Sequence, residues 1–298
     1  MKKNYFLLAV AAVAFAACSN DESDNLEPSI ISLTSNIVEA ETTRANLTDA
    51  EAQNTQFVTS KSIKVEAYKT GQTTAYTTGN YTTNGSGTLT GSLYYPATDE
   101  NIDICAYYPN TISSSSTSFT VDATQTTAAN YQSYDLMYAT KLTNKAKGST
   151  HALTFNHALS KIIVNLQAGD GITDDNISSN VTAVKIKNTK PKAEFTITNG
   201  AVGTITASGT AADINITGAT MTSSHVGIIV PQKINSGTAF IEITYNSKTY
   251  TYSLSSTTTF GAKKAYTYNI KINAVGISVS TSITDWSSQT AVNGTVTI

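Results

Sequence analysis

The sequence predicts an all-β protein built from antiparallel β-sandwiches. From residue 28 onward, nearly every apolar segment alternates apolar and polar residues, which is the period of a strand with one buried face. Thr, Ser, Asn, Gly and Tyr take the place of charged residues in the composition, and β-branched Thr and aromatic Tyr favour a pleated, half-exposed surface. Many short strands separated by Gly, Asn, Ser and Thr turns are typical of β-sandwiches.

In the first half of the chain, alternation predicts strands within residues 29–40 and 62–68 and around Cys105. The best helical candidate is the short segment 49–53. The polar runs TTGNYTTNGSGTLTGS and NTISSSSTS predict loops or hairpin tips. Cys105 has the apolar neighbours Ile102, Ile104 and Tyr107, so we expect it to be a small buried residue of a strand.

In the second half, strands are expected within residues 161–167, 193–200 and 264–280. The segment 239–254 predicts a hairpin, because two alternating runs flank a turn at Asn246–Ser247. A Lys-, Thr- and Gly-rich stretch at 141–150 lies between two strand-rich blocks of ordinary domain size. We therefore expect an N-terminal sandwich over residues 45–146 and a C-terminal sandwich over residues 147–298.

The first residues predict a bacterial lipoprotein. Two lysines precede an apolar run from Phe6 to Ala17, which is too short to span a bilayer and is typical of a signal peptide. Residues 1–17 would be removed, and the small residues before Cys18 resemble a lipobox that directs acylation of that cysteine. Acyl chains contribute about 0.8 kcal/mol per buried CH₂ and would hold Cys18 on a membrane. A plain secretory signal with an incidental cysteine is the alternative.

The acidic cluster Asp21, Glu22 and Asp24 follows Cys18. It resembles the tag that sends some lipoproteins to the outer face of the outer membrane. A solvated tether would have the same composition, so both interpretations stay open.

The composition argues against several classes of function. Charged residues make up 13% of the chain and the net charge is -2, so no basic surface is expected for nucleic acid. His151, His157 and His225 show no paired ligand spacing, and we expect no metal and no cofactor. No phosphate-binding loop or nucleophile elbow occurs, and the carboxylates in TDENID and GDGITDDN are interpreted as turn residues. No catalytic residue is predicted.

Five segments together resemble the fimbrillin family, the lipoprotein subunits of type V pili and their relatives. They are YPATDENIDICAYYP (95–109), YDLMYAT (134–140), LTFNHALSKIIVNL (153–166), VGIIVPQ (226–232) and FGAKKAYTYNIKI followed by ITDW (260–286). The resemblance implies two transthyretin-like β-sandwiches and head-to-tail assembly with other fimbrial subunits by strand exchange. It also implies an outer-membrane precursor that reaches the cell surface and the fimbrium.

In that family, an arginine-specific protease cuts shortly after the first strand. Arg44 matches this position, and it is the single arginine beside 18 lysines, so cleavage between Arg44 and Ala45 would occur at one place in the chain. The cut would release residues 18–44, the tether and first strand. Alternatively, the arginine is a chance of composition and the tether stays intact.

Removal of the first strand would open an apolar groove, because Ile31, Leu33 and Ile37 are expected to face inward. The segment that refills the groove should be extended with apolar residues at period two. Val292, Val296 and Ile298 have the matching parity and mark residues 287–298 as the candidate donor strand, whereas residues 266–280 are more suited to closing the second sandwich of their own chain.

The resemblance leaves the role among shaft, tip and anchor subunits open, since the chain is shorter than many shaft subunits. The alternative function is a surface-anchored adhesin or glycan-binding module that does not polymerise. Its platform would be exposed aromatic rings, with Tyr76, Tyr81, Tyr94 and Tyr95 as candidates, and its receptor would lie on a host or bacterial surface.

Overall fold

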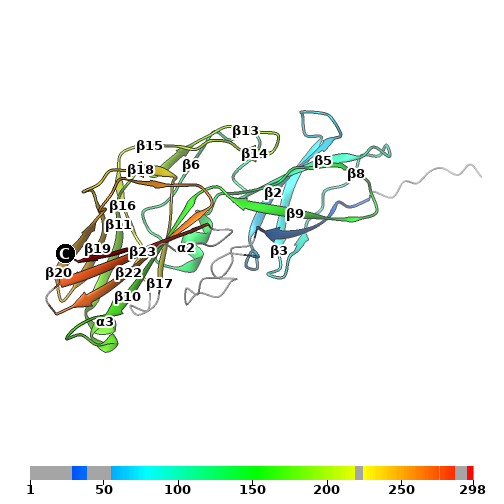
Figure 1. Ribbon diagram of the computed structural model, residues 1–298. Coiled ribbons are helices and arrows are strands. Elements are labelled where there is room, and N and C mark those ends of the chain that lie inside the picture. Colours follow the sequence, from blue (N-terminus) through cyan, green and yellow to red (C-terminus); the bar gives the residue numbers. More distant parts are fainter. Residues whose placement is uncertain (1–28, 39–54, 219–223, 275, 286–293, 298) are drawn as a thin grey trace, which may run out of the picture.

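The computed structural model describes residues 29–38, 55–218, 224–274, 276–285 and 294–297. Strands dominate these ranges, and the two helices described are short, which confirms the all-β class. Figure 1 shows an elongated molecule with two lobes, the earlier strands in one lobe and the later strands in the other. The predicted helix at 49–53 lies outside the described residues.

The first lobe is a closed ring of strands. Pairing runs in the order β2-β3-β4-β1-β9-β7-β5, and β5 pairs back with β2, while β8 is attached to β5. The strands are β1 (Ser32–Ile37), β2 (Ser62–Lys69), β3 (Thr77–Thr83), β4 (Thr88–Thr90), β5 (Ile102–Tyr108), β7 (Met137–Ala139), β8 (Leu142–Lys145) and β9 (Thr150–His157). Within this ring β1 is the element that joins β4 to β9.

The second lobe contains two main sheets, with the orders β17-β10-β22-β23-β24 and β16-β11-β19-β20. The strands of the first are β10 (Ser160–Ala168), β17 (Ser224–Ile229), β22 (Lys264–Asn273), β23 (Gly276–Asp285) and β24 (Gly294–Thr297). The strands of the second are β11 (Val181–Thr189), β16 (Ala212–Asn215), β19 (Ala239–Tyr245) and β20 (Lys248–Ser253).

Short pairings and two helices complete the fold of the described ranges. The pairings join β6 (Ser118–Thr120) and β15 (Thr206–Ser208) to β12 (Lys192–Glu194), β13 (Ile197–Thr198) to β14 (Ala201–Val202), and β18 (Gln232–Ile234) to β21 (Thr258–Phe260). The helices are α2 (Ala128–Ser133) and α3 (Asp174–Asn180).

Among the described strands, two ladders are parallel, which differs from the purely antiparallel arrangement predicted. β1 runs parallel to β9, and β22 runs parallel to β10. β9 leads into β10 after only two residues, Ala158 and Leu159, so one nearly continuous ribbon connects the lobes. The alternation of apolar residues reports which face of a strand is buried, but it carries no information on the direction of the neighbouring strand.

The two hydrophobic cores do not divide the chain at residues 146 and 147. β9, which follows that position, belongs to the ring of the first lobe. β6 and α2, which precede it, pack with strands of the second lobe. β5 is buried on both faces, with Ile104 in the first core and Cys105 in the second. Cys105 is buried in a strand, as its apolar neighbours predicted.

Some local predictions are confirmed and others are wrong. Asn246 and Ser247 form the predicted hairpin turn, both with positive φ, between β19 and β20. The segment GDGITDDN is not only a turn, because Thr173 caps α3 with a reciprocal Thr173–Asn176 capping box. The Thr-rich segment 77–92 is likewise not only loop: it contains β3 and β4, with Tyr81 buried.

The outer edge of β17 is closed by a side chain. The buried Gln125 accepts a hydrogen bond from the backbone N–H of Ile228 at 2.7 Å and donates one to the Ile228 carbonyl at 3.0 Å. The amide group thus satisfies the same two backbone groups that a neighbouring strand would use. Unpaired edges template the addition of other chains, so this contact protects the edge at Ile228.

Asp103 on β5 forms a buried ionic contact that ties β5 to the segment around β8. Its carboxylate accepts a hydrogen bond from the backbone N–H of Asn144 at 2.9 Å and pairs with the Lys141 ammonium at 2.9 Å. Burial acts to raise the pKa of Asp103, but the Asn144 and Lys141 contacts outweigh it and hold the pKa below its ordinary value.

We predict that acidification weakens the fold partly through Asp103. A carboxyl group with a depressed pKa in the folded state adds stability above its unfolded pKa, and this stability is lost as the pH falls through the folded pKa. Urea denaturation of Asp103→Asn from pH 7 to pH 3 should show a smaller loss of unfolding free energy than the parent chain. The exposed Asp170→Asn serves as the control, and identical profiles for the parent chain and Asp103→Asn would contradict the prediction.

Candidate functional site

The candidate site is the seat of β1 in the ring of the first lobe. Ile31, Leu33 and Ile37 are 0%, 2% and 1% exposed and belong to the first hydrophobic core. Ser32 and Asn36, between them, are exposed. The strand therefore presents one apolar face to the core, and the three residues make up 3 of the 19 buried members of that core.

β1 is hydrogen bonded on both sides. Along β9 the register extends over six positions, from Ser32 beside Thr150 to Ile37 beside Phe155. On the other side, Leu33 and Thr34 pair antiparallel with β4. A strand held on both sides leaves two unpaired edges when it is withdrawn.

Backbone contacts beyond the ladders extend the seat at both ends. The N–H of Ile31 donates to the Leu93 carbonyl at 2.8 Å, and that of Ile37 donates to the Thr55 carbonyl at 2.9 Å. In the middle, the N–H of Ser35 donates to the Gly87 carbonyl at 2.7 Å. The groove that holds β1 therefore extends at least from Ile31 to Ile37.

A buried tyrosine anchors the first residue of the seat. The Tyr81 hydroxyl donates a hydrogen bond to the Ile31 carbonyl at 2.7 Å. Burial raises the pKa of Tyr81 to about 12, so the hydroxyl keeps its proton and remains a donor. An occupant that replaces β1 must offer an acceptor here, because a buried donor without a partner costs about 1–3 kcal/mol.

The walls of the seat come from segments whose role the sequence did not reveal. Leu89 lies in a run interpreted as polar loop, and Leu93 follows that run directly, yet both side chains are buried in the first core. Their signal is the even spacing of Tyr81, Leu89 and Leu93 in a stretch otherwise rich in Thr, Ser, Asn and Gly. Such isolated residues are weak evidence for a strand on their own.

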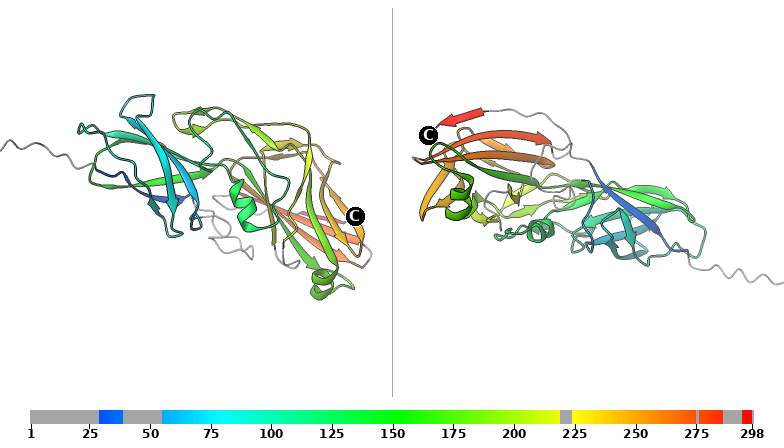
Figure 2. Two further views of the ribbon diagram at one scale, coloured as in Figure 1. Left: turned by 180° about the vertical axis from the view of Figure 1, so that it is seen from behind. Right: turned by 90° about the horizontal axis from the view of Figure 1, so that it is seen from below.

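The C-terminal strands lie far from this seat. β22 and β23 pair over ten positions, and β24 pairs with β23 over four, from Ser278 beside Thr297 to Thr281 beside Gly294. β24 is the outermost strand of its sheet and lies in the second lobe, away from β1 (Figure 2). The backbone at Val296 is part of β24, whereas Val292 and Ile298 lie outside the described residues.

Several other predicted positions also lie outside the described residues: Cys18, Arg44, Ala45 and Trp286. Within the described ranges, no group of three or more His, Cys, Asp and Glu side chains is placed to hold a metal ion. His157 lies buried at the end of β9 beside Asp135, with Nδ1 and Oδ1 3.0 Å apart. No helix in these ranges combines the length and hydropathy of a membrane span.

The four candidate tyrosines do not form an exposed aromatic platform. Tyr81 and Tyr95 are 1% and 7% exposed, and Tyr76 packs partly buried against the first core. Tyr94 is 42% exposed and bridges to the exposed Ile30. The prediction is therefore wrong for Tyr81 and Tyr95, whose rings are buried in the core, and Tyr94 alone of the four is classed as exposed.

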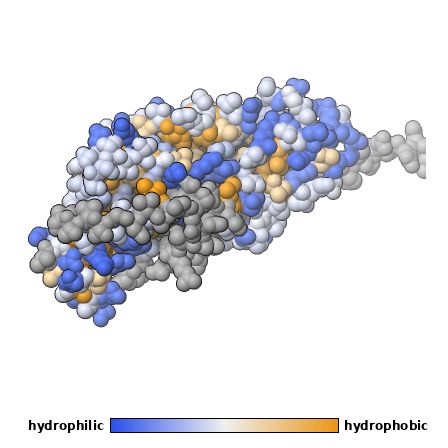
Figure 3. Space-filling model, in the orientation of Figure 1, coloured by the Kyte–Doolittle hydropathy of each residue, from blue (hydrophilic) through white to orange (hydrophobic). Residues whose placement is uncertain are grey.

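The surface shown in Figure 3 is mostly hydrophilic at both ends, and hydrophobic residues gather near its middle. Among the described residues, the large hydrophobic side chains classed as exposed are Ile30, Tyr94 and Ile283. The buried apolar side chains Ile31, Leu33 and Ile37 do not contribute to this surface, because the ring around β1 covers them.

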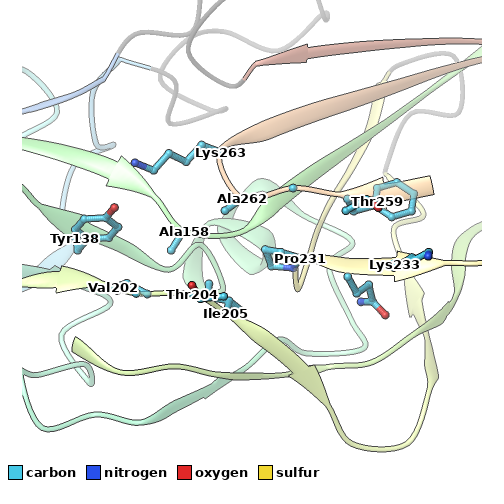
Figure 4. A pocket seen from close by; sticks show the side chains of 14 residues that line it. Tyr138, Ala158, Val202, Thr204, Ile205, Pro231, Lys233, Thr259, Ala262 and Lys263 are labelled. Carbon is cyan, nitrogen blue, oxygen red and sulfur yellow. The ribbon is translucent and has the colours of Figure 1, made fainter. Parts of the chain in front are cut away.

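A pocket of about 410 Å³ opens beside the junction of the lobes (Figure 4). Val202, Thr204 and Ile205 line one side, and Pro231 and Lys233 line another.

At the end of the pocket nearer the first lobe, the Lys263 ammonium lies 5.5 Å from the centre of the Tyr138 ring and donates a hydrogen bond to Asn156 Oδ1 at 3.2 Å. The described residues that line the pocket are apolar side chains, uncharged polar side chains and lysines, and they include no carboxylate, histidine or cysteine.

Comparison with known families decides the assignment of the chain. The model of the fimbrillin-like family matches residues 43–286. The chain belongs to the fimbrillin-like family. A relative of this fimbrillin-like chain is Fim1C of Bacteroides uniformis, named as a candidate fimbrium subunit, with 27% identity over 96% of each chain.

Solved structures share the fold. A candidate cell adhesion protein of Bacteroides uniformis covers 87% of this chain and 99% of its own, with a TM-score of 0.64 and 23% identity. One of Bacteroides ovatus covers 88% and 99%, with a TM-score of 0.63 and 20% identity. The tip fimbrial protein Mfa3 of Porphyromonas gingivalis, with a C-terminal truncation, covers 86% and 99%, with a TM-score of 0.52 and 12% identity.

The burial of β1 predicts a large effect of its core residues on stability. Leu33→Ala should lower the unfolding free energy of the full chain by about 2–5 kcal/mol, because it removes buried volume from a packed core. The exposed Ser32→Ala on the same strand should change it by about 0.5 kcal/mol or less. Urea denaturation measures both, and equal effects of the two variants would show that β1 is not seated in the core.

Proposed function

We propose that this chain is a structural subunit of a cell-surface fimbria and that it polymerises head to tail by strand exchange. The observation that carries the proposal is the seat of β1. A strand near the N-terminus completes the ring of the first lobe, and it precedes the single arginine of the chain. Membership of the fimbrillin-like family and the name of the relative Fim1C support the fimbrial role.

In the proposed sequence of events, the precursor is exported and acylated at Cys18 and reaches the outer membrane. An arginine-specific protease then cuts between Arg44 and Ala45. The segment 18–44 is no longer covalently attached, but β1 keeps its ladders and its buried side chains until another strand competes for the seat.

The energetic reason for exchange is the exposure that an empty seat would create. Each of Ile31, Leu33 and Ile37 contributes roughly 1.5–3 kcal/mol of burial, and the edges of β4 and β9 lose their partners. The candidate occupant is the segment 287–298 of another subunit, which would restore both terms. Repetition of this heterologous contact gives an open filament.

Shaft, tip and anchor roles are all compatible with this mechanism, since each needs a seat, a donor strand or both. A receptor on a host or bacterial surface would be contacted by the assembled fibre. The outer-membrane lipid is a partner only before the cut, through Cys18.

We predict that Arg44→Lys blocks processing and fibre formation. The substitution keeps the positive charge and removes the guanidinium that an arginine-specific protease recognises. N-terminal sequencing of surface material should give Ala45 for the parent chain and Cys18 for the variant, and unboiled electrophoresis should show a ladder only for the parent. A ladder built from subunits that all begin at Cys18 would refute the role of the cut.

We also predict that deletion of residues 287–298 leaves a folded subunit that does not polymerise by itself. β22 and β23 pair with each other over ten positions without the deleted residues, so the second lobe should keep its fold. Circular dichroism should be nearly unchanged, and the ladder should be lost. Fibres of normal length from the truncated chain would exclude this segment as the donor.

A further inference from the structure

The candidate donor segment, read backwards, resembles the strand that it would replace. Residues 31–37 read ISLTSNI, and residues 298 to 292, read backwards, give ITVTGNV. Isoleucine, threonine and asparagine coincide at three of the seven positions, and the other four pairs are Ser with Thr, Leu with Val, Ser with Gly, and Ile with Val. Read forwards, the same segment places Gly294 against Leu33 and Val296 against Ser35.

The side-chain sizes on the core face of the seat distinguish the reversed alignment from the forward one. Its four inward positions hold Ile31, Leu33, Ser35 and Ile37, so the third position is small while the others are large. Ser35 is 7% exposed and lies beside Leu153 of β9. An extra methylene in a packed core costs about 1–3 kcal/mol, so a valine at the Ser35 position is disfavoured.

The backbone is also close at the small position. A Cβ placed on Gly87 would lie 3.0 Å from the Ser35 carbonyl oxygen, so the chain next to Ser35 approaches without room for a side chain on Gly87. This contact involves the strand backbone. The size limit on the side chain comes from the burial of Ser35, and Gly294 meets it in the reversed reading whereas Val296 does not in the forward reading.

The outer face points to the same register. The Thr154 hydroxyl donates a hydrogen bond to Asn36 Oδ1 at 3.1 Å, across the β1–β9 ladder. In the reversed reading Asn293 takes the position of Asn36, so an identical amide would lie beside Thr154. In the forward reading Thr297 takes that position.

The direction also gains in pairing. β1 is parallel to β9 over six positions and antiparallel to β4 over two. A reversed strand would be antiparallel to β9 and parallel to β4, so the slightly more stable antiparallel arrangement would cover the longer of the two ladders. In its own subunit the tail pairs with β23 on one side over four positions. The seat provides a partner on each side, so transfer of the tail from the edge to the seat increases its pairing.

We propose that residues 292–298 of a second copy of this chain enter the seat of β1 in the direction opposite to β1. Ile298 then occupies the position of Ile31, Val296 that of Leu33, and Gly294 that of Ser35. This inference rests on the proposed function and specifies the direction and register of the strand that performs it.

Disulfide trapping tests the register. Full-length subunits are cleaved at Arg44 with an arginine-specific protease, and Thr154→Cys subunits are mixed with subunits carrying either Asn293→Cys or Thr297→Cys. Non-reducing electrophoresis should show the mixed dimer with Asn293→Cys at least about tenfold more abundant than with Thr297→Cys. Each cysteine variant alone is the control, and the native Cys105 is buried and common to all samples.

Each outcome has one meaning. Preferential trapping of Thr297→Cys would overturn the direction. A ladder from the parent chain without trapping of either pair would overturn the register while leaving strand exchange intact. Absence of any ladder from the cleaved parent chain would overturn the proposed function and this inference with it.

A second measurement depends on side-chain size and needs no cross-link. Gly294→Val should reduce polymer yield at least about tenfold, because it places a branched side chain at the position of Ser35. Gly294→Ser reproduces the residue found there and should polymerise within about twofold of the parent. A higher yield from Gly294→Val would overturn the inference, because the forward reading places Gly294 at the large position of Leu33.

Discussion

The fold of the first lobe depends on the pairing of β1 between β4 and β9. Without β1, the ring β2-β3-β4-β1-β9-β7-β5 is no longer closed, and its remaining strands form an open sheet with two exposed edges. The other strands of the ring are held by further ladders, such as those that join β2 to β3 and β5. β1 lies between β4 and β9 and is remote in sequence from both. Closure of the ring therefore depends on long-range pairing.

The ribbon β9–β10 connects the ring of the first lobe to the sheets of the second lobe. β1 lies parallel to its first half and β22 lies parallel to its second half. The ribbon therefore runs through both lobes, and it pairs with β1 in the first lobe and with β22 in the second. Antiparallel hairpins account for local folding, whereas these two parallel ladders join segments that are more than 100 residues apart and determine the overall topology.

Alternation of apolar residues is sufficient to predict the all-β class, the inward positions of Ile31, Leu33 and Ile37, and the hairpin at Asn246–Ser247. It cannot predict that β1 is parallel to β9, because pairing direction depends on partners remote in sequence. β3 and β4 escape prediction because Thr and Gly mask the few apolar residues that they bury. α3 was not predicted, because a helix of seven residues is too short to show a helical period of apolar residues in the sequence. The seat itself requires three-dimensional information, since its walls come from β4, β9 and the segments around Gly87 and Leu93.

The Gln125 contact has a consequence for the number of neighbours that one subunit can have. By occupying both backbone groups of Ile228, this amide withdraws that position of β17 from lateral association. In the proposed mechanism each subunit uses one acceptor seat and one donor segment, which gives it a valence of two, and the capped position at Ile228 adds no further contact. Units of valence two join into unbranched threads, whereas a third adhesive edge would produce branched networks or lateral aggregates.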